Sequence, residues 1–232
     1  MPKLQKRPAL ILFDLDGTLA HTLPQLGLAT KAVAARLQLK VPSDDDMANY
    51  VGNGVTMLLA RTVASRFDVE INSLDPALMQ QARALFNEEY LKVLDKDFVI
   101  YDGVKEGLRA FKDKGIKLAV VTNKPETFAK PLLNYMGLTS YFDFILGGEV
   151  LKERKPDPTP LFYVCGMLDE KPSDCIMVGD SANDILAGQK AKMVTVAFTY
   201  GYNCHKDVRE SDPDYVFDSF KSLNSLILSF KD

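Results

Sequence analysis

Residues 9–19 read ALILFDLDGTL, and this stretch decides the fold. Its first five residues are apolar without interruption, which is typical of a strand buried on both faces of a parallel sheet. Similar apolar runs occur at 118–121, 142–146, 176–178 and 194–198, with a weaker one at 215–217. Apolar residues at helical spacing lie between the runs, as in 104–111 and 128–135. Strands that alternate with helices of this length predict a doubly wound α/β fold with a parallel sheet.

A long helical segment interrupts this alternation directly after the first strand. No strand-like run occurs in residues 14–117, whereas 26–37 and 78–86 have apolar residues at helical spacing. Ser43 and Asp75 are suited to cap two of the expected helices, because their side chains can accept hydrogen bonds from the first backbone N–H groups. The expected domains are an α/β core of residues 1–19 and 96–232 and an inserted helical-bundle cap of residues 20–95.

Composition and charge exclude several functional classes. The 232 residues carry a formal net charge of −3, so the chain lacks the basic footprint of a nucleic-acid-binding protein. Two histidines, His21 and His205, are too few for zinc sites built from several histidines. The first apolar run is shorter than the apolar region of a signal sequence, which has roughly 7–15 residues, and no run approaches the roughly 18 residues of a membrane span. With three cysteines in no paired spacing, we expect a cytoplasmic protein with no membrane or nucleic-acid partner.

Reactive side chains stand at the carboxyl ends of the predicted strands. Asp14 and Asp16 follow the first run, Thr122 the second and Asp180 the fourth, while Lys155 lies in the loop after the third. Ligands of open α/β sheets bind at this edge, so these groups are expected to meet in one crevice. Clustered carboxylates repel one another unless a cation joins them, and Mg²⁺ is expected because it prefers oxygen ligands. Mn²⁺ and Co²⁺ accept similar sites.

A metal, a lysine and a hydroxyl facing one aspartate suit an incoming phosphate group. Asp14 is expected to attack phosphorus and form an aspartyl-phosphate. Lys155 and Mg²⁺ would neutralise the phosphoryl oxygens in the transition state. Asp16, two residues further on, is placed to protonate the leaving oxygen and then to activate water. These residues predict a phosphoryl-transfer enzyme that acts on a small phosphate ester.

Four short motifs resemble those of the haloacid dehalogenase-like (HAD) hydrolases. They are Phe13-Asp14-Leu15-Asp16-Gly17-Thr18-Leu19, Val121-Thr122-Asn123, Lys155-Pro156-Asp157-Pro158 and Val178-Gly179-Asp180-Ser181-Ala182-Asn183-Asp184. The motifs occur in the family's order, the similarity spans residues 9–200, and the helical insert matches the family's C1 cap. One motif would be weak evidence, whereas four in order with the predicted topology are specific. The resemblance implies a HAD-like Rossmannoid core with a helical cap.

The resemblance also implies a role for each motif residue. Asp14 would be the nucleophile, Asp16 the general acid and base, and Thr122, Asn123 and Lys155 the phosphate-binding residues. The metal ligands would be Asp14, the backbone carbonyl of Asp16, and Asp180, with Asp184 supporting the site. The chain departs from the family pattern at His21-Thr22, where members often carry Asp-Ser, and this departure concerns the contacts at the cap hinge.

Secondary motifs resemble one subgroup of the family, the bacterial phosphoglycolate phosphatases. They are residues 50–55, 101–104, 122–125 and 199–202. The resemblance implies hydrolysis of a small phosphorylated acid, 2-phosphoglycolate, to glycolate and phosphate. Cap residues would then contact the substrate. The candidates are the backbone N–H groups around Gly52, Asn53 and Gly54, with Arg61 adding a cation if it falls on the same face.

Two alternative functions remain open at this point. A phosphosugar phosphatase or phosphomutase of the same superfamily would use the same residues, and in the mutase Asp16 would help to return the phosphoryl group to a second hydroxyl. A receiver-like module that binds a phosphoryl group without catalysis is the alternative from a different class. Asp16 argues against such a module, because a general base beside the aspartyl-phosphate would shorten its life. Either a monomer or a homodimer is compatible with the sequence.

Overall fold

The computed structural model describes residues 4–204 and 206–230. Its main element is a six-stranded sheet in the order β5-β4-β1-β6-β7-β8, and every neighbouring pair is parallel. The strands are β1 (Leu10–Phe13), β4 (Lys117–Pro125), β5 (Phe144–Gly148), β6 (Cys175–Gly179), β7 (Val194–Phe198) and β8 (Tyr215–Phe217). This sheet confirms the expected α/β class.

The first strand lies at the centre of the sheet because both of its faces are apolar. All four residues of β1 are fully buried, and β1 pairs with β4 on one side and β6 on the other. Ile11 and Phe13 point into one apolar cluster, whereas Leu10 and Leu12 point into a second cluster on the opposite face. Two hydrophobic layers therefore hold the strand that leads into the first of the four motifs.

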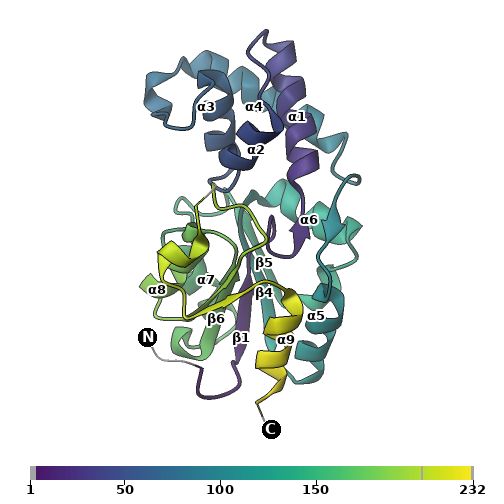
Figure 1. Ribbon diagram of the computed structural model, residues 1–232, viewed down its shortest axis with the longest axis vertical. Coiled ribbons are helices and arrows are strands. Elements are labelled where there is room, and N and C mark those ends of the chain that lie inside the picture. Colours follow the sequence, from purple (N-terminus) through teal and green to yellow (C-terminus); the bar gives the residue numbers. More distant parts are fainter. Residues whose placement is uncertain (1–3, 205, 231–232) are drawn as a thin grey trace.

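Helices cover both faces of the sheet (Figure 1). One face is covered by α5 (Val104–Asp113), α6 (Glu126–Tyr135) and α9 (Phe220–Leu228), whose apolar residues join the cluster of Ile11 and Phe13. The other face is covered by α7 (Thr159–Met167) and α8 (Ala182–Lys190), which contribute to the cluster of Leu10 and Leu12. The chain therefore winds over both faces, as the alternation of strands and helices predicts.

Four further helices stand together over one end of the sheet (Figure 1). They are α1 (Leu23–Arg36), α2 (Asp44–Tyr50), α3 (Val55–Ala64) and α4 (Pro76–Leu91), and we call them the cap. As the sequence predicts, the Ser43 side chain accepts the N–H of Asp46 in a capping box at the start of α2, and Asp75 caps α4. The domain limits at residues 20 and 95 stay a prediction.

A short two-stranded ribbon joins the cap to the rest of the chain. The strand β2 (Ala20–His21) pairs antiparallel with β3 (Val99–Ile100). The expectation of no strand in residues 14–117 was therefore wrong at these two sites. A strand of two residues is too short to show the alternation by which strands are recognised.

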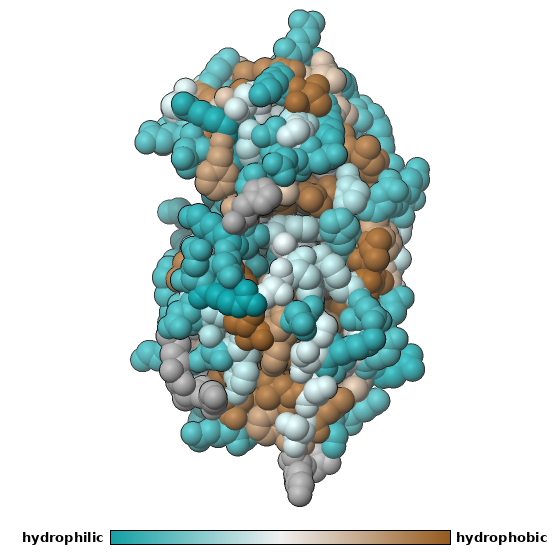
Figure 2. Space-filling model, in the orientation of Figure 1, coloured by the Kyte–Doolittle hydropathy of each residue, from teal (hydrophilic) through white to brown (hydrophobic). Residues whose placement is uncertain are grey.

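The remaining regular elements are four short 3₁₀ turns. They are η1 (Ile71–Ser73), η2 (Thr139–Tyr141), η3 (Pro172–Asp174) and η4 (Val208–Ser211). Figure 2 shows a mainly hydrophilic surface on which apolar side chains form small groups, and the outline narrows between the cap and the sheet. Within the described residues, no helix combines the length and the apolar character needed to cross a bilayer.

The aromatic packing of α9 provides a test of this core. Phe220 is 1% exposed, and its ring stacks on Phe13 at 5.8 Å and on Phe198 at 5.6 Å between ring centroids. We expect Phe220→Ala to lower the free energy of unfolding by about 3–5 kcal/mol, because it leaves a cavity against the central strand. Urea denaturation monitored by circular dichroism measures the change. The control Phe162→Ala, at a site that is 45% exposed, should shift stability by about 0.5 kcal/mol or less.

Candidate active site

The ends of three parallel strands bring the predicted groups to one edge of the sheet. Asp14 directly follows β1, and its N–H donates to the carbonyl of Val178 on β6 at 2.9 Å, which continues the pairing of the two strands. Thr122 lies in β4, and Asp180 follows β6. The register of the sheet alone therefore places these three side chains at neighbouring positions.

Three carboxylates converge at this edge. Oxygens of Asp14, Asp180 and Asp184 lie within 4.8 Å of one another. The Lys155 ammonium lies 3.0 Å from Oδ1 of Asp14 and donates to Oδ1 of Asp184 at 2.6 Å. It also donates to the carbonyl of Val121 at 2.5 Å, and its side chain is only 2% exposed. Lys155 is thus a buried cation that holds two carboxylates together.

Asp180 is held by hydrogen bonds rather than by a lysine. The hydroxyl of Thr18 donates to Oδ1 at 2.6 Å, and the backbone N–H of Tyr202 donates to Oδ2 at 2.5 Å. Gly17, with φ at +85°, passes so close that a Cβ there would lie 2.2 Å from Oδ2 of Asp180. Only glycine fits this point of the first motif, because both the positive φ and the close approach exclude a side chain.

The electrostatics of the cluster show an excess of negative charge. Burial raises the pKa of Asp14 to about 6; Lys155 opposes the shift, while Asp184 and Asp16 add to it. Burial also raises the pKa of Asp180 well above its usual value, and the charges of Asp184 and Asp14 contribute. One buried lysine is therefore not enough for three carboxylates. A hard divalent cation with oxygen ligands fits this donor set.

Asp16 points away from the cluster and has partners of its own. The Thr22 hydroxyl donates to Oδ1 at 2.6 Å, and the Lys124 ammonium donates to both carboxylate oxygens at 3.0 Å. Its side chain is 15% exposed, so it faces the solvent-accessible side of the site. The two aspartates of the first motif thus have different partners: Asp14 lies in the carboxylate cluster with Lys155, and Asp16 lies beside Lys124.

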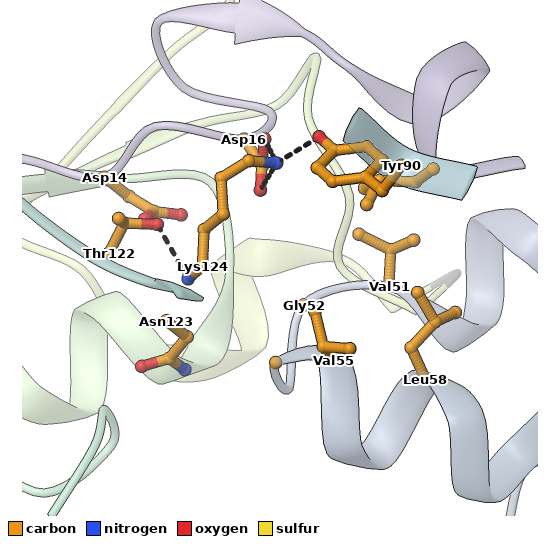
Figure 3. Close-up of a pocket in the computed structure, with 12 residues that line it drawn as sticks. Asp14, Asp16, Val51, Gly52, Val55, Leu58, Tyr90, Thr122, Asn123 and Lys124 are labelled. Atoms are coloured by element: carbon orange, nitrogen blue, oxygen red, sulfur yellow. Dashed lines mark hydrogen bonds and ion pairs between the residues drawn. The ribbon is translucent and has the colours of Figure 1, made fainter. Parts of the chain in front are cut away.

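Lys124 was not among the predicted site residues. Its side chain is 2% exposed and reaches from β4 to Asp16 and to the hydroxyl of Tyr90 on α4, at 2.5 Å (Figure 3). Burial alone would lower the pKa of Lys124, but the charge of Asp16 and the contact with Tyr90 raise it above the ordinary value. A lysine in Thr122-Asn123-Lys124-Pro125 resembles a solvated loop residue, so only the secondary motif itself could have marked it.

The predicted phosphate-binding residues Thr122 and Asn123 have different hydrogen-bond partners. Thr122 is 5% exposed, and its hydroxyl accepts the N–H of Lys124 at 3.2 Å. The side chain of Asn123 donates to the carbonyl of Lys155 at 3.0 Å and accepts its N–H at 3.1 Å. Asp184 accepts the hydroxyl of Ser181 at 2.7 Å. The Asn123 amide therefore fixes the loop of Lys155, and Asp184 fixes the Lys155 side chain.

A cleft opens in front of Asp14, between the core and the cap (Figure 3). From the core it is lined by Asp14, Asp16, Thr122, Asn123 and Lys124, and from the cap side by Leu26, Val51, Gly52, Gly54, Val55, Leu58 and Tyr90. Gly52 and Gly54 both have positive φ, at +112° and +80°. The structure therefore brings these two glycines to the cleft, and most of the cap side chains around them are apolar.

Asn53 and Arg61, the other two cap candidates, do not line this cleft. The Arg61 guanidinium donates to the carbonyl of Tyr50 at 2.8 Å and to the Asn53 side chain at 3.1 Å, and it lies 4.2 Å from the centroid of the Phe67 ring. With its donors directed at this loop, Arg61 acts as a brace for the segment that presents the glycines.

Comparison with known proteins agrees with this geometry. A model of the haloacid dehalogenase-like hydrolase family matches residues 11–198. The chain belongs to this family. Among other HAD hydrolases, it is 38% identical over 229 residues to a phosphoglycolate phosphatase of Colwellia psychrerythraea, covering 99% of each chain. It is 40% identical over 218 residues to a phosphoglycolate phosphatase of Haemophilus influenzae, covering 94% of this chain and 97% of that one.

A solved HAD structure shares the fold over nearly the full length. The crystal structure of a predicted phosphoglycolate phosphatase from Haemophilus somnus superposes with a TM-score of 0.88 at 35% identity, covering 96% of this chain and 99% of that one. The cap and the core of this HAD hydrolase thus have counterparts in a single relative. The family and fold implied by the four motifs are confirmed.

The raised pKa of Asp14 predicts a pH-dependent stability. In buffer without divalent cations, Asp14→Asn should raise the melting temperature at pH 8, since the folded protein favours the neutral group. Protonation of Asp14 stabilises the folded wild type. This stabilisation is complete below the ordinary pKa of 3.8 and is lost as the pH rises through about 6. The gain should therefore be largest above pH 6, with an upper limit of about 3 kcal/mol, and should shrink toward pH 4.

Thermal denaturation of the wild type and the variant between pH 4 and pH 8 measures this difference. Asp102→Asn is the control, because Lys221 holds the pKa of Asp102 below its usual value. That variant should gain no stability at pH 8. A gain for Asp14→Asn that stayed constant over this pH range would contradict the assignment of the shift to Asp14.

Proposed function

We propose that the protein is a phosphomonoesterase that hydrolyses 2-phosphoglycolate to glycolate and phosphate. The observation that carries this proposal is the separation of the two aspartates of the first motif. Both line the cleft, but Asp14 belongs to the carboxylate cluster around Lys155, whereas Asp16 pairs with Lys124. A nucleophile beside cations and a second carboxylate near the leaving group are the two requirements of hydrolysis through an aspartyl-phosphate. The phosphoglycolate phosphatases among the relatives support the choice of substrate.

The reaction runs in two steps on these residues. An oxygen of Asp14 attacks phosphorus and forms the P–O bond of the aspartyl-phosphate, while the bond from phosphorus to the glycolate oxygen breaks. Asp16 gives its proton to that leaving oxygen. In the second step Asp16 takes a proton from water as the water oxygen attacks phosphorus, and phosphate leaves with Asp14 regenerated. Asp16 ends with the proton that it gave up, so the cycle closes.

The remaining site residues position and neutralise the phosphate in this proposal. Lys155 offers an ammonium beside Asp14, and Thr122 offers a hydroxyl from the next strand. Asn123 orders the loop of Lys155, and Asp184 orients its side chain through the 2.6 Å hydrogen bond. These contacts fix the conformation of Lys155 before the substrate binds. A preorganised cation of this kind lowers the activation barrier because it needs no rearrangement to bind the phosphoryl oxygens.

We propose that a divalent metal, Mg²⁺ in preference to Mn²⁺ or Co²⁺, completes the site. Asp14, Asp180 and the backbone carbonyl of Asp16 would hold it, and the raised pKa values of the first two fit a site that lacks positive charge. When bound, the metal supplies Lewis-acid stabilisation of the phosphoryl oxygens. We place the enzyme in the reducing cytoplasm, which the three free cysteines support. A monomer or a homodimer remains a prediction.

Two other functions are less well supported. A phosphosugar phosphatase or phosphomutase needs a larger polar acceptor site, whereas the cap side of this cleft is mostly apolar. A receiver-like module has no use for Asp16 at the cleft, because a base there would hydrolyse its aspartyl-phosphate. The apolar cap and the position of Asp16 therefore favour hydrolysis of a small ester.

Replacement of the nucleophile tests the proposed function. Asp14→Asn should lower phosphate release from 2-phosphoglycolate by at least about 1000-fold, because the amide cannot attack phosphorus. Release is measured as inorganic phosphate, with circular dichroism to verify the fold. The control Asp113→Asn makes the same change at an exposed site and should retain wild-type activity. Activity of Asp14→Asn within tenfold of the wild type would rule out Asp14 as the nucleophile.

Removal of divalent cations tests the metal. EDTA should abolish phosphate release, and added Mg²⁺ should restore it. The added cation returns to the carboxylate cluster the positive charge that Lys155 alone does not provide. EDTA saturated with Mg²⁺ beforehand should have no effect, which controls for the chelator itself. We expect Asp180→Asn to need at least about tenfold more Mg²⁺ for half-maximal activity. Full activity in metal-free buffer would contradict this part of the mechanism.

A further inference from the structure

A cation in the cleft would pair with a carboxylate on the substrate, and none of the cap residues that line the cleft is basic. The cap side chains at the cleft are mostly apolar, and the Arg61 guanidinium is directed at its own loop. Lys155 is not among the residues that line the cleft, and its ammonium is paired with Asp14 and Asp184. Of the described residues that line the cleft, only Lys124 is basic. The search for a carboxylate-binding group therefore leads to the core.

The Lys124 ammonium is held in one place by two partners. It lies 3.0 Å from each carboxylate oxygen of Asp16 and 2.5 Å from the hydroxyl of Tyr90 (Figure 3). The nitrogen also lies 4.7 Å from the centroid of the Tyr90 ring. Such a desolvated and immobile ammonium can bind an anion strongly, because binding neither orders a flexible chain nor removes much water.

The shape of the substrate places its carboxylate near this ammonium. In 2-phosphoglycolate a single carbon atom separates the ester oxygen from the carboxylate carbon. Asp16 must reach the ester oxygen to protonate it. The carboxylate is therefore confined to the neighbourhood of Asp16, and Lys124 already pairs with Asp16 in that neighbourhood. A longer phosphorylated acid would carry its charge beyond this point.

We propose that Lys124 selects the substrate by binding its carboxylate, exchanging the Asp16 carboxylate for that of the substrate. This inference rests on the proposed function and assigns the substrate specificity to a residue of the core. In the structure both oxygens of Asp16 accept from Lys124, and Oδ1 also accepts from Thr22. After the exchange Thr22 still holds Oδ1, while Oδ2 is free to face the leaving oxygen. Substrate binding and presentation of the acid are then a single event.

The exchange also involves the cap. Tyr90 belongs to α4, and its hydroxyl accepts a hydrogen bond from the Lys124 ammonium. The same hydroxyl donates to the side chain of Gln25 on α1 at 3.4 Å. Gln25 in turn donates to the carbonyl of Leu94 at 2.9 Å. One of the two groups that position the Lys124 ammonium therefore belongs to the cap, and Gln25 fixes that group in turn.

Three two-carbon phosphate esters of different charge test the proposal in the wild-type enzyme. They are 2-phosphoglycolate, which is anionic at the far carbon, ethyl phosphate, which is neutral there, and O-phosphoethanolamine, which is cationic. With Lys124 as the selecting group, kcat/KM should fall in this order. We expect a factor of about 10–100 between the first two esters, as is typical of a hydrogen bond between charged groups. No preference for 2-phosphoglycolate in the wild type would refute the proposed function itself.

Neutral replacements of Lys124 then test the residue. Lys124→Met should reduce the ratio of kcat/KM for 2-phosphoglycolate to that for ethyl phosphate to within about threefold of one, and it should raise the relative rate with O-phosphoethanolamine. Most of the loss should appear in KM for 2-phosphoglycolate. Lys130→Met is the matched control, because Lys130 lies on α6 with an exposed side chain that pairs with Glu126. It should leave all three rates unchanged.

The ratio of kcat/KM for 2-phosphoglycolate to that for ethyl phosphate distinguishes a role of Lys124 in substrate specificity from an indirect effect on Asp16. An equal loss on all three esters would mean that Lys124 serves only Asp16 or the fold, and this outcome would overturn the proposal. Lys124→Gln, which keeps a hydrogen-bond donor, is a second neutral variant whose folded fraction is checked by circular dichroism. If a folded Lys124→Gln or Lys124→Met enzyme retained the wild-type preference for 2-phosphoglycolate, the carboxylate-binding role would be excluded.

Discussion

The burial of like charges at one edge of the sheet is the constraint on which the rest of the structure depends. Asp14, Asp180 and Asp184 are brought within 4.8 Å by the ends of β1 and β6 and the start of α8. Their repulsion has to be balanced, and Lys155 meets this need only in part. The backbone at Gly17 packs directly against Asp180, so no side chain fits at this position. The same excess of negative charge is the basis of the proposed metal site.

A second charged contact ties the chemistry of the core to the position of the cap. Asp16 and Lys124 belong to the core, whereas Tyr90 belongs to α4 of the cap. The Tyr90 ring also packs edge-on against Phe128 of α6, with 5.0 Å between the ring centroids. Polar and apolar contacts thus meet at one tyrosine. Tyr90 is therefore a direct link between the cap and the charged groups of the core.

The sequence predicted the fold better than the site, and the reason is physical. Apolar runs mark buried strands because both faces need apolar side chains, so the runs 176–178 and 194–198 lie in the fully buried strands β6 and β7. The central strand β1 was found in the same way. The ribbon of β2 and β3 was missed because two residues carry no periodic signal. Lys124 was missed because its burial depends on Tyr90, which lies 34 positions away in the chain.

The ribbon of β2 and β3 has a consequence for how such an enzyme can change over evolutionary time. His21 pairs with Val99, so the chain leaves the core and returns to it at adjacent points. Everything between these two residues could be shortened, lengthened or replaced by another module without altering the register of the six-stranded sheet. The carboxyl edge of the sheet and the cap above it can therefore change in sequence at different rates. A new cap would then be combined with an unchanged carboxylate cluster, and the same core could act on a different substrate.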